Sequence, residues 1–422
     1  MKPASKSKLS ALALAVALAL GTAAVSAPTA VAADAPPAKP TVSKALSKPI
    51  SEAQKAIAAK KFDEALAKLA EAEALPGRTP YDTFAIAQLR AYSLGQLGRM
   101  PEAIPSYVAE VESGFMTPEE TDRLGRGIAA LYFQQKDYPH AIEFGQKVIA
   151  KGTADSDTWF VVAYSQFLSG KSADAKTVLD QYLAEFAKKG QTPAENILQL
   201  QLQMGLKSND NPSVLAALSK LAEFYKKPEY WHDLLGIMRD TAGRGTASEG
   251  YTLNIYRLMR EAGTMKEGSD FLEMAQLAVS QGSPGEAVDA ITRGQKAGAF
   301  TSSSDASASK LQLQSAQKLS DADRAGLSKF ETEARSAKTG EGDVRLGQAL
   351  LSYDQPDKAA EAIQRGIAKG GLRNADEAQI LLGISLLRLG RKDDAVAAFA
   401  GAKGSDARLG SLAKLWGMYA RG

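Results

Sequence analysis

The stretch LGRKDDAVAAF (Leu389–Phe399) shares its pattern with LGRMPEAIPSY (Leu97–Tyr107), far upstream in the same chain. In both, Leu-Gly-Arg is followed by three residues, then Ala, and then an aromatic residue four positions later. Gly can take the left-handed conformation that ends a helix, and a small Ala lets two helices approach closely. The shared pattern therefore predicts a pair of antiparallel helices that the chain uses more than once.

This arrangement recurs as a small residue in a first helix, a Gly or Lys at a turn, and an Ala near the start of a second helix. Apolar residues follow helical spacing nearly throughout, and no stretch alternates Val, Ile and Thr as a strand does. The chain is therefore predicted to be all-α, a row of helical hairpins. The sets, spaced by 7 and 5 residues, are Ala91, Gly98, Ala103; Ala129, Lys136, Ala141; Ala163, Gly170, Ala175; Ala275, Gly282, Ala287; and Gly383, Gly390, Ala395.

Signals for helix starts and stops recur with a period near 36 residues. Thr79, Thr117 and Thr192 each precede Pro and have an acidic residue three positions on, which is the pattern of a capping box. Asp155 is predicted to start a further helix. The predicted stops are Gly114, Gly152, Gly190, Gly263, Gly298, Gly370 and Gly404, with KKP (Lys226–Pro228) and KTG (Lys338–Gly340) filling two gaps.

The first 33 residues have the pattern of a secretory signal. Lys at positions 2, 6 and 8 precedes an Ala-rich apolar run over residues 9–25, and residues 31–33 offer a small-residue cleavage site. The run is shorter than the roughly 20 strongly apolar residues of a membrane-spanning helix. We expect a cleaved signal, with an uncleaved anchor as the alternative.

Charge and composition narrow the function. The formal net charge is +3, and the three Lys of residues 1–33 account for it, so the rest of the chain is neutral. Neutrality argues against a nucleic-acid binder, which needs clustered Lys and Arg. The chain has no Cys, which excludes disulfides and thiolate metal sites. Its two His, His140 and His232, are too few for a conventional zinc site, so no metal or cofactor is expected.

The residues of the last hairpin resemble the tetratricopeptide repeat (TPR). The family's unit is two helices, and its stacked units form a right-handed α-solenoid with a concave groove, which the resemblance implies here. The residues at the consensus spacing are Gly383, Leu386, Gly390, Ala395, Phe399 and Ala402.

The chain is expected to divide into six parts. They are a signal peptide (1–33), a Pro-rich flexible tether (34–49), an N-terminal TPR array (50–192), a degenerate TPR-like middle (193–300), an irregular helical, Ser-rich segment (301–342), and a C-terminal TPR pair with a capping helix (343–422). In the last part, Trp416 is expected to cover the final apolar face of a solvating cap helix.

Four stretches of the second half carry a further resemblance: YWHDLLGIMRD (Tyr230–Asp240), EAVDAITRGQKAGAF (Glu286–Phe300), AAEAIQRGIAKGGL (Ala359–Leu372) and AQILLGISLLRLGRKDDAVAAFAGAKG (Ala378–Gly404). They are similar to periplasmic TPR proteins of Gram-negative bacteria that accompany TonB energy-transduction systems. This resemblance implies a periplasmic scaffold whose protein partners belong to the TonB/ExbB/ExbD apparatus of outer-membrane uptake, with membrane contact only through them. A cell-envelope or peptidoglycan assembly factor is the alternative.

One stretch resembles a catalytic motif. ESGFMTP (Glu112–Pro118) resembles the catalytic Glu-Ser segment of lytic transglycosylases, in which a buried Glu acts as general acid. The Gly-Ala-x-Gly-Leu-x-Gln run of that family does not follow. We interpret Glu112 as a helix end and predict that the chain is not an enzyme.

The remaining function is binding. If Asp122 and Ser156 are the first positions of their repeats, several aromatic and basic residues fall on helix faces that the family turns toward its groove. They could receive an extended or helical peptide with apolar and acidic residues. The alternative is that the aromatics only pack between neighbouring repeats, as we expect for Trp159 in the core. The candidate groove residues are Tyr92, Arg123, Arg126, Phe133, Phe160, Tyr164 and Phe167.

Overall fold

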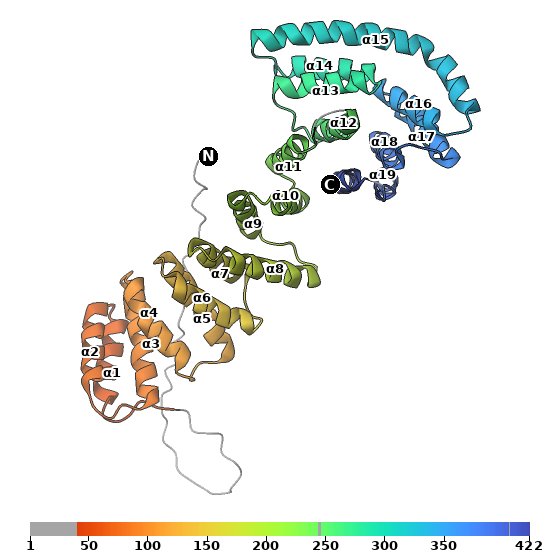
Figure 1. Ribbon diagram of the computed structural model, residues 1–422. Helices are drawn as coiled ribbons and strands as arrows, with labels where there is room; N and C mark the ends of the chain where they lie inside the picture. Colours follow the sequence, from red (N-terminus) through yellow and green to blue (C-terminus); the bar gives the residue numbers. More distant parts are fainter. Residues whose placement is uncertain (1–39, 244–245, 405) are drawn as a thin grey trace, which may run out of the picture. The chain divides into compact units, whose positions relative to one another are not determined.

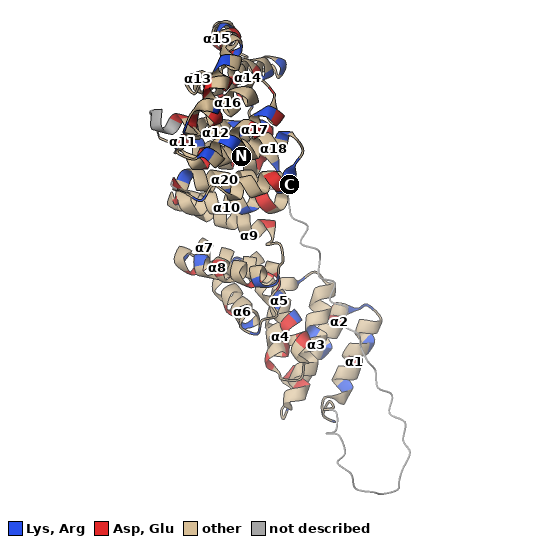
Figure 2. Cartoon of the chain, turned by 90° about the vertical axis from the view of Figure 1, so that its right-hand side faces the viewer, with Lys and Arg blue, Asp and Glu red and all other residues tan. Residues whose placement is uncertain are grey.

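The computed structural model describes residues 40–243, 246–404 and 406–422, and within these ranges every regular element is a helix (Figure 1). The all-α prediction is confirmed. The chain divides into unit 1, which ends at Ile197, and unit 2, which begins at Leu198. Basic and acidic residues are intermixed in both units (Figure 2). The predicted signal peptide lies outside the described residues.

Unit 1 consists of consecutive hairpins, each packed against the next. Its helices are α1 (Ser47–Ala58), α2 (Phe62–Ala74), α3 (Pro80–Gln96), α4 (Met100–Glu112), α5 (Pro118–Gln134), α6 (Tyr138–Ala150), α7 (Ser156–Leu168) and α8 (Ser172–Lys188), and α9 (Glu195–Ser208) contains the boundary between the units.

The last residues of the predicted tether belong to the fold of unit 1. Residues 40–49 are described, and their last part is built into unit 1 because α1 already begins at Ser47. Leu46 is completely buried, and the amide of Ser43 donates a hydrogen bond to Asp82 Oδ1 at 2.8 Å. A segment with a buried Leu and a paired backbone amide is part of the fold, so the prediction of a tether up to residue 49 is wrong at its end.

The turns within the hairpins share one backbone geometry. In each, a residue with positive φ follows the first helix, and the next amide donates back to a carbonyl five residues earlier, for example from Arg99 to Leu94 at 2.8 Å and from Arg391 to Leu386 at 3.0 Å. This is the hydrogen bond that closes a Schellman motif. The turn positions read from the sequence are confirmed. The left-handed residues are Lys60, Gly98, Lys136, Gly170, Asn209, Gly282, Asp354 and Gly390.

Close helix contact explains the small residues on either side of each turn. The predicted Ala of the second helices, which include Ala103, Ala141 and Ala395, are completely buried. A Cβ atom at Gly383 would overlap the ring of Phe399, so only Gly fits where the helix Ala375–Arg388 (α18) crosses the helix Lys392–Ala400 (α19).

Ala395→Leu is therefore expected to lower the free energy of unfolding by about 1–3 kcal/mol, because the larger side chain must displace a neighbouring helix. Urea unfolding followed by circular dichroism measures this change. An unfolding curve that matches the wild type would show that Ala395 does not lie at a tight helix contact.

The predicted helix starts hold at three of four positions. Thr79 and Thr117 form capping boxes, and Asp155 accepts from the amide of Thr158 at 2.9 Å. The prediction at Thr192 is wrong, because α9 begins only at Glu195. There the amide of Ala194 donates to the hydroxyl of Tyr182 at 2.7 Å, and this bond holds the segment outside the helix.

The seven predicted Gly stops all have positive φ, and Lys226 with φ 51° supplies the stop in the KKP stretch. Gly340 is different, because its φ is −79° and it begins a helix instead of ending one. Its amide donates to the carbonyl of Gly370 at 2.8 Å, and a Cβ at this position would overlap the backbone of Gly366. Gly340 is needed for close backbone approach and not for a left-handed turn.

Unit 2 contains one helix that breaks the hairpin pattern. Residues 301–342 were expected to be helical but irregular, whereas Ser303–Ser336 form the single continuous helix α15, which packs against α13, α14 and α16 (Figure 1). The helices of unit 2 after α9 are α10 (Asn211–Tyr225), α11 (Pro228–Asp240), α12 (Thr246–Glu261), α13 (Gly268–Ser280), α14 (Pro284–Lys296), α15, α16 (Glu341–Ser352), α17 (Pro356–Lys369), α18 (Ala375–Arg388), α19 (Lys392–Ala400) and α20 (Ala407–Arg421).

Unit 2 returns on itself, because its last helix α20 packs against α10 and α12 as well as α18 and α19. The hydroxyl of Tyr419 donates to the carbonyl of Glu261 at 2.6 Å, and the Tyr419 ring lies 5.9 Å from the ring of Trp231. Arg408 donates to the carbonyl of Ala242 at 3.3 Å. We call this set of contacts the α20 closure.

The α20 closure corrects the expectation of a solvating cap helix. Trp416 does cover an apolar face, and its ring stacks on Phe399 with centroids 5.6 Å apart. It is, however, 0% exposed, because α20 is covered by helices from the start of the unit. The last helix is an internal element of unit 2.

Candidate functional site

Four of the predicted groove residues form one group, which we call the α5–α7 aromatic cluster: Phe133, Phe160, Tyr164 and Phe167. The Tyr164 ring lies 5.8 Å from Phe133, 5.2 Å from Phe160 and 6.3 Å from Phe167. The three rings of α7 are spaced by four and three residues, so they lie on one helix face, and Phe133 reaches them from the end of α5.

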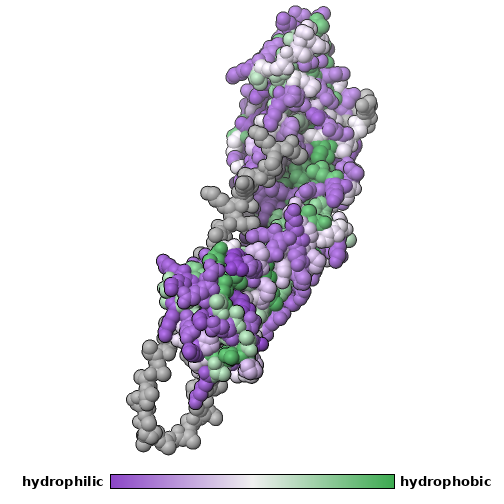
Figure 3. Space-filling model, turned by 90° about the vertical axis from the view of Figure 1, so that its left-hand side faces the viewer, coloured by the Kyte–Doolittle hydropathy of each residue, from purple (hydrophilic) through white to green (hydrophobic). Residues whose placement is uncertain are grey.

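The rings of the cluster differ in exposure. Phe167 is only 5% exposed and belongs to the core, whereas Phe133, Phe160 and Tyr164 are half-buried. Next to them Leu168 is 44% exposed. Because the rings touch between α5 and α7, they pack neighbouring repeats together and still leave apolar surface for a ligand. On the face seen in Figure 3, hydrophobic residues likewise reach a mainly hydrophilic surface in separate patches.

The other three predicted residues lie apart from the cluster. The ring of Tyr92 packs edge-on against Phe62 at 6.3 Å. Arg126 donates to the carbonyl of Thr153 at 2.9 Å and lies 3.6 Å from Asp155, so it ties α5 to the turn before α7. Arg123 is exposed, and at 1.5 Å per residue it lies roughly 15 Å along α5 from the ring end of the helix.

The enzyme-like stretch forms a helix end, as interpreted from the sequence. Glu112 is exposed at the last position of α4, Gly114 has φ 75°, and Thr117 caps α5. The two histidines lie in different units, with His140 Nδ1 2.8 Å from Asp137 and His232 Nδ1 3.1 Å from the carbonyl of Thr264. In the described part of the chain, no three His, Asp or Glu side chains converge as metal ligands.

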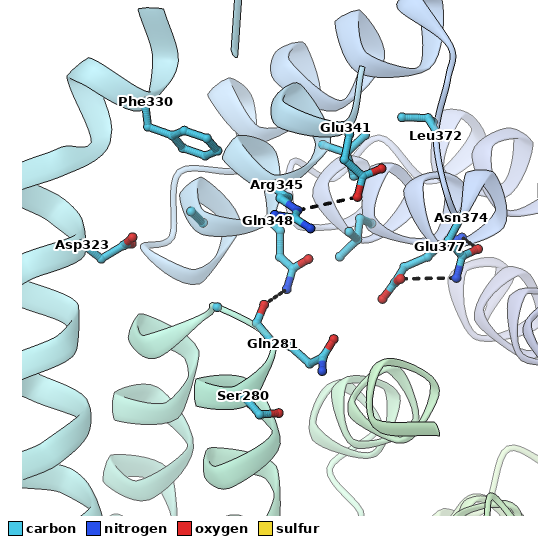
Figure 4. A pocket seen from close by; sticks show the side chains of 14 residues that line it. Ser280, Gln281, Asp323, Phe330, Glu341, Arg345, Gln348, Leu372, Asn374 and Glu377 are labelled. Atoms are coloured by element: carbon cyan, nitrogen blue, oxygen red, sulfur yellow. Dashed lines mark hydrogen bonds and ion pairs between the residues drawn. The ribbon is translucent and has the colours of Figure 1, made fainter. Parts of the chain in front are cut away.

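A cavity of about 460 Å³ in unit 2, which we call the unit-2 pocket, was not predicted. It lies among the end of α13, α15, α16 and the start of α18 (Figure 4). Phe330 and Leu372 form apolar walls, and Gln348 donates to both the carbonyl of Gln281 and the hydroxyl of Ser283 at 2.9 Å. The pocket was not predicted because one of its walls is α15, and residues 301–342 were expected to form an irregular helical segment.

A second cavity of about 530 Å³ lies beside a buried ion-pair network at α12 and α14. Arg257 donates to Glu286 at 2.8 Å and to Asn254 at 2.9 Å, and Arg260 donates to Glu286 at 3.0 Å. All three charged side chains are almost completely buried. Two arginines in the apolar stretch LNIYRLMRE were the only sequence signal for the network.

The lining of this cavity carries four carboxylates, that of Asp354 included, against three guanidinium groups, so it offers no net attraction to an anion. Glu286 and Asp289 face Arg260 and Arg293, and Glu261 accepts from Arg388 at 3.1 Å. The network joins α12, α14 and α18.

Unit 1 contains a buried carboxyl group that the sequence did not reveal. Glu110 in α4 is 5% exposed, and within the described residues its Oε1 has no hydrogen-bond partner. Burial raises the pKa of Glu110 to about 7.

Glu110→Gln is expected to raise the free energy of unfolding of unit 1 by about 1–3 kcal/mol at pH 8. At pH 4.5 the variant and the wild type are expected to have nearly the same free energy of unfolding. The native state holds the Glu110 proton more tightly than the unfolded chain, so the wild type loses stability as the pH rises from 4.5 to about 7. Melting curves from pH 4.5 to 8 measure the effect. A stability difference that does not change with pH would exclude this titration.

The fold and these surfaces define an all-helical protein of sequential hairpins. Residues 344–408 match the model of the tetratricopeptide repeat family, so this segment, which runs from α16 to the start of α20, carries tetratricopeptide repeats. No curated protein matches the chain by sequence. Among the helices of the described residues, none is long and apolar enough to cross a membrane.

Two solved structures align with this chain over most of its length. A tetratricopeptide repeat protein from Parabacteroides merdae has 10% identity and a TM-score of 0.27, with 89% of this chain and 99% of that chain covered. The TPR2AB-domain:pHSP90 complex of yeast Sti1 has 13% identity and a TM-score of 0.25, with 90% and 99% covered.

Proposed function

We propose that this chain is a non-catalytic scaffold that binds a partner protein through the α5–α7 aromatic cluster. The observation that carries the proposal is the group of three half-buried rings beside an exposed Leu168. Large aromatic side chains that are partly exposed and held rigid by their neighbours are typical anchors of protein interfaces. The tetratricopeptide repeats of residues 344–408 support the same class of function.

The partner segment is proposed to be apolar, as an amphipathic helix or an extended strand with apolar side chains every few residues. Arg126 is occupied within the fold and Arg123 lies along α5 from the rings, so acidic residues of the partner would meet Arg123 at some distance from its apolar anchor.

We further propose that the scaffold works in the periplasm with components of a TonB/ExbB/ExbD apparatus. The support is the signal-like composition of residues 1–33 and the resemblance of the stretches between Tyr230 and Gly404.

A pull-down from envelope extract, read by quantitative mass spectrometry, tests the binding surface. The double variant Phe160→Ala/Tyr164→Ala is expected to reduce recovery of the specific partner by about tenfold or more, because both rings are anchors. Phe115→Ala is the matched control, since this ring is 38% exposed in a different group with Tyr81. Equal recovery with the double variant would place the binding surface elsewhere.

The same pull-down separates the two levels of the proposal. TonB, ExbB or ExbD proteins in the wild-type sample, lost with the double variant, support the periplasmic assignment. A specific partner from outside that apparatus supports the scaffold and overturns the TonB assignment.

A further inference from the structure

The unit-2 pocket carries more negative than positive charge. Three carboxylates face it, from Asp323, Glu341 and Glu377, against one guanidinium, that of Arg345 (Figure 4). Arg345 already lies 3.6 Å from Glu341. Behind the lining, Glu249 is a further carboxylate, which accepts from Ser280 at 2.8 Å. The pocket is thus short of cations.

The contacts of Asp323 and Glu377 do not neutralise their charge. Asp323 accepts from the hydroxyl of Tyr353 at 2.6 Å, and Glu377 accepts from the amide of Asn254 at 3.1 Å. Both donors are neutral. The nearby guanidinium of Arg324 lies over the ring of Tyr353, at 4.5 Å from its centroid, and forms no ion pair with Asp323. Within the described chain, neither carboxylate forms a salt bridge.

The position of these carboxylates is fixed before any ligand arrives. The amide of Asn254 holds Glu377 from α12, and Tyr353 holds Asp323 from the end of α16. Preorganised charges in a partly enclosed cavity attract an opposite charge more strongly than freely moving surface groups, because less side-chain order is lost on binding.

The walls suit the stem of a long cationic side chain. Phe330 and Leu372 are half-buried apolar walls on two sides of the cavity, and Gln281 and Asn374 bring amide groups to the same space (Figure 4). Lys and Arg bury their methylene stems on apolar surface while the charged end meets carboxylates or an aromatic face. A volume of about 460 Å³ also falls in the range of ligand sites, roughly 300–1,000 Å³.

We propose that the unit-2 pocket binds an extended protein segment through a Lys or Arg side chain, which lies between Asp323 and Glu377 with its stem against Phe330. This site is additional to the proposed function. It rests on the proposed function in one respect, which is that the ligand is a protein. The chain then has two binding sites of different chemistry, an apolar one in unit 1 and a cation site in unit 2.

Affinity selection with defined peptides tests this site without knowledge of the natural partner. The full chain is immobilised and offered blocked nine-residue peptides with uncharged randomised flanks and a central Lys, Arg, norleucine or Glu. Lys and Arg peptides are expected to be retained about tenfold better than norleucine peptides, since norleucine keeps the stem and removes the charge. Equal retention of Lys and norleucine peptides would overturn the proposal.

Variants assign the binding to the pocket. Asp323→Asn and Glu377→Gln keep the size and hydrogen-bonding oxygen of each side chain, and each is expected to weaken the best Lys peptide about tenfold in fluorescence anisotropy. Glu331→Gln is the matched control, because this α15 carboxylate pairs with Arg335 outside the pocket. Unchanged affinity in both Asp323→Asn and Glu377→Gln, with circular dichroism of the folded protein, would also overturn the proposal.

This outcome is independent of unit 1. Phe160→Ala/Tyr164→Ala is expected to leave retention of the Lys peptides unchanged. Selective Lys retention, combined with a pull-down that does not depend on the aromatic cluster, would keep the cation site and reject the proposed surface in unit 1.

Discussion

Trp416→Ala is expected to lower the free energy of unfolding of unit 2 by about 3–5 kcal/mol, the range for removing a large buried aromatic side chain. The ring is fully buried, stacks on Phe399 and forms the centre of the packing of α20. Urea unfolding followed by circular dichroism measures the change.

Trp416→Phe is the matched control. Within the described residues the indole N–H of Trp416 has no hydrogen-bond partner, so replacement by Phe removes side-chain volume but no hydrogen bond. The variant is expected to lower the free energy of unfolding by about 1 kcal/mol. Leu311→Ala, at a 68% exposed position of α15, is expected to have almost no effect. If Trp416→Ala were no more destabilising than Leu311→Ala, α20 would not be an internal element of unit 2.

Glu286→Gln is expected to destabilise unit 2 by about 3–5 kcal/mol, because it leaves the buried guanidinium groups of Arg257 and Arg260 without their shared counter-charge. Adding Arg257→Met to this variant removes one uncompensated charge and is expected to restore part of the loss. Urea unfolding of the single and double variants gives the two values. A double variant less stable than Glu286→Gln alone would contradict this account.

The ion pairs of Glu286 also predict that the stability of unit 2 depends on pH. Burial alone would raise the pKa of Glu286, but the neighbouring Arg257 and Arg260 lower it to about 2. The native state therefore releases this proton more readily than the unfolded chain. The stabilisation is fully present above the ordinary pKa of about 4.5 and is lost as the pH falls toward 2. Glu286→Gln should lack this part of the acid sensitivity.

The hairpins could be predicted because their signals are local. A left-handed residue and a small residue at fixed spacing specify the turn and the close contact wherever they occur, so Gly98, Gly170 and Gly390 lie at turns as expected. The prediction failed where a Gly serves a long-range contact. Gly340 is a glycine like those that end helices, but its role is to let its backbone approach the backbone of Gly366 closely.

The candidate sites were predicted less completely for the same reason. Phe160, Tyr164 and Phe167 share one helix face, and helical spacing alone brings them together. The unit-2 pocket joins Gln281, Asp323 and Glu377, which are far apart in the chain. Only the packing of α15 beside α13, α16 and α18 places them around one space, and no local pattern encodes that packing.

The α20 closure has a consequence for how unit 2 can change. In an open row of repeats, a hairpin can be gained or lost at an end, because only one neighbour is affected. In unit 2 the final helix must meet α10 and α12, so the number of hairpins between them is set by geometry. Duplication or deletion of a single hairpin would separate α20 from α10 and α12. Unit 2 is therefore a module of fixed size, although it is built from hairpins of a kind that can vary in number in an open row of repeats.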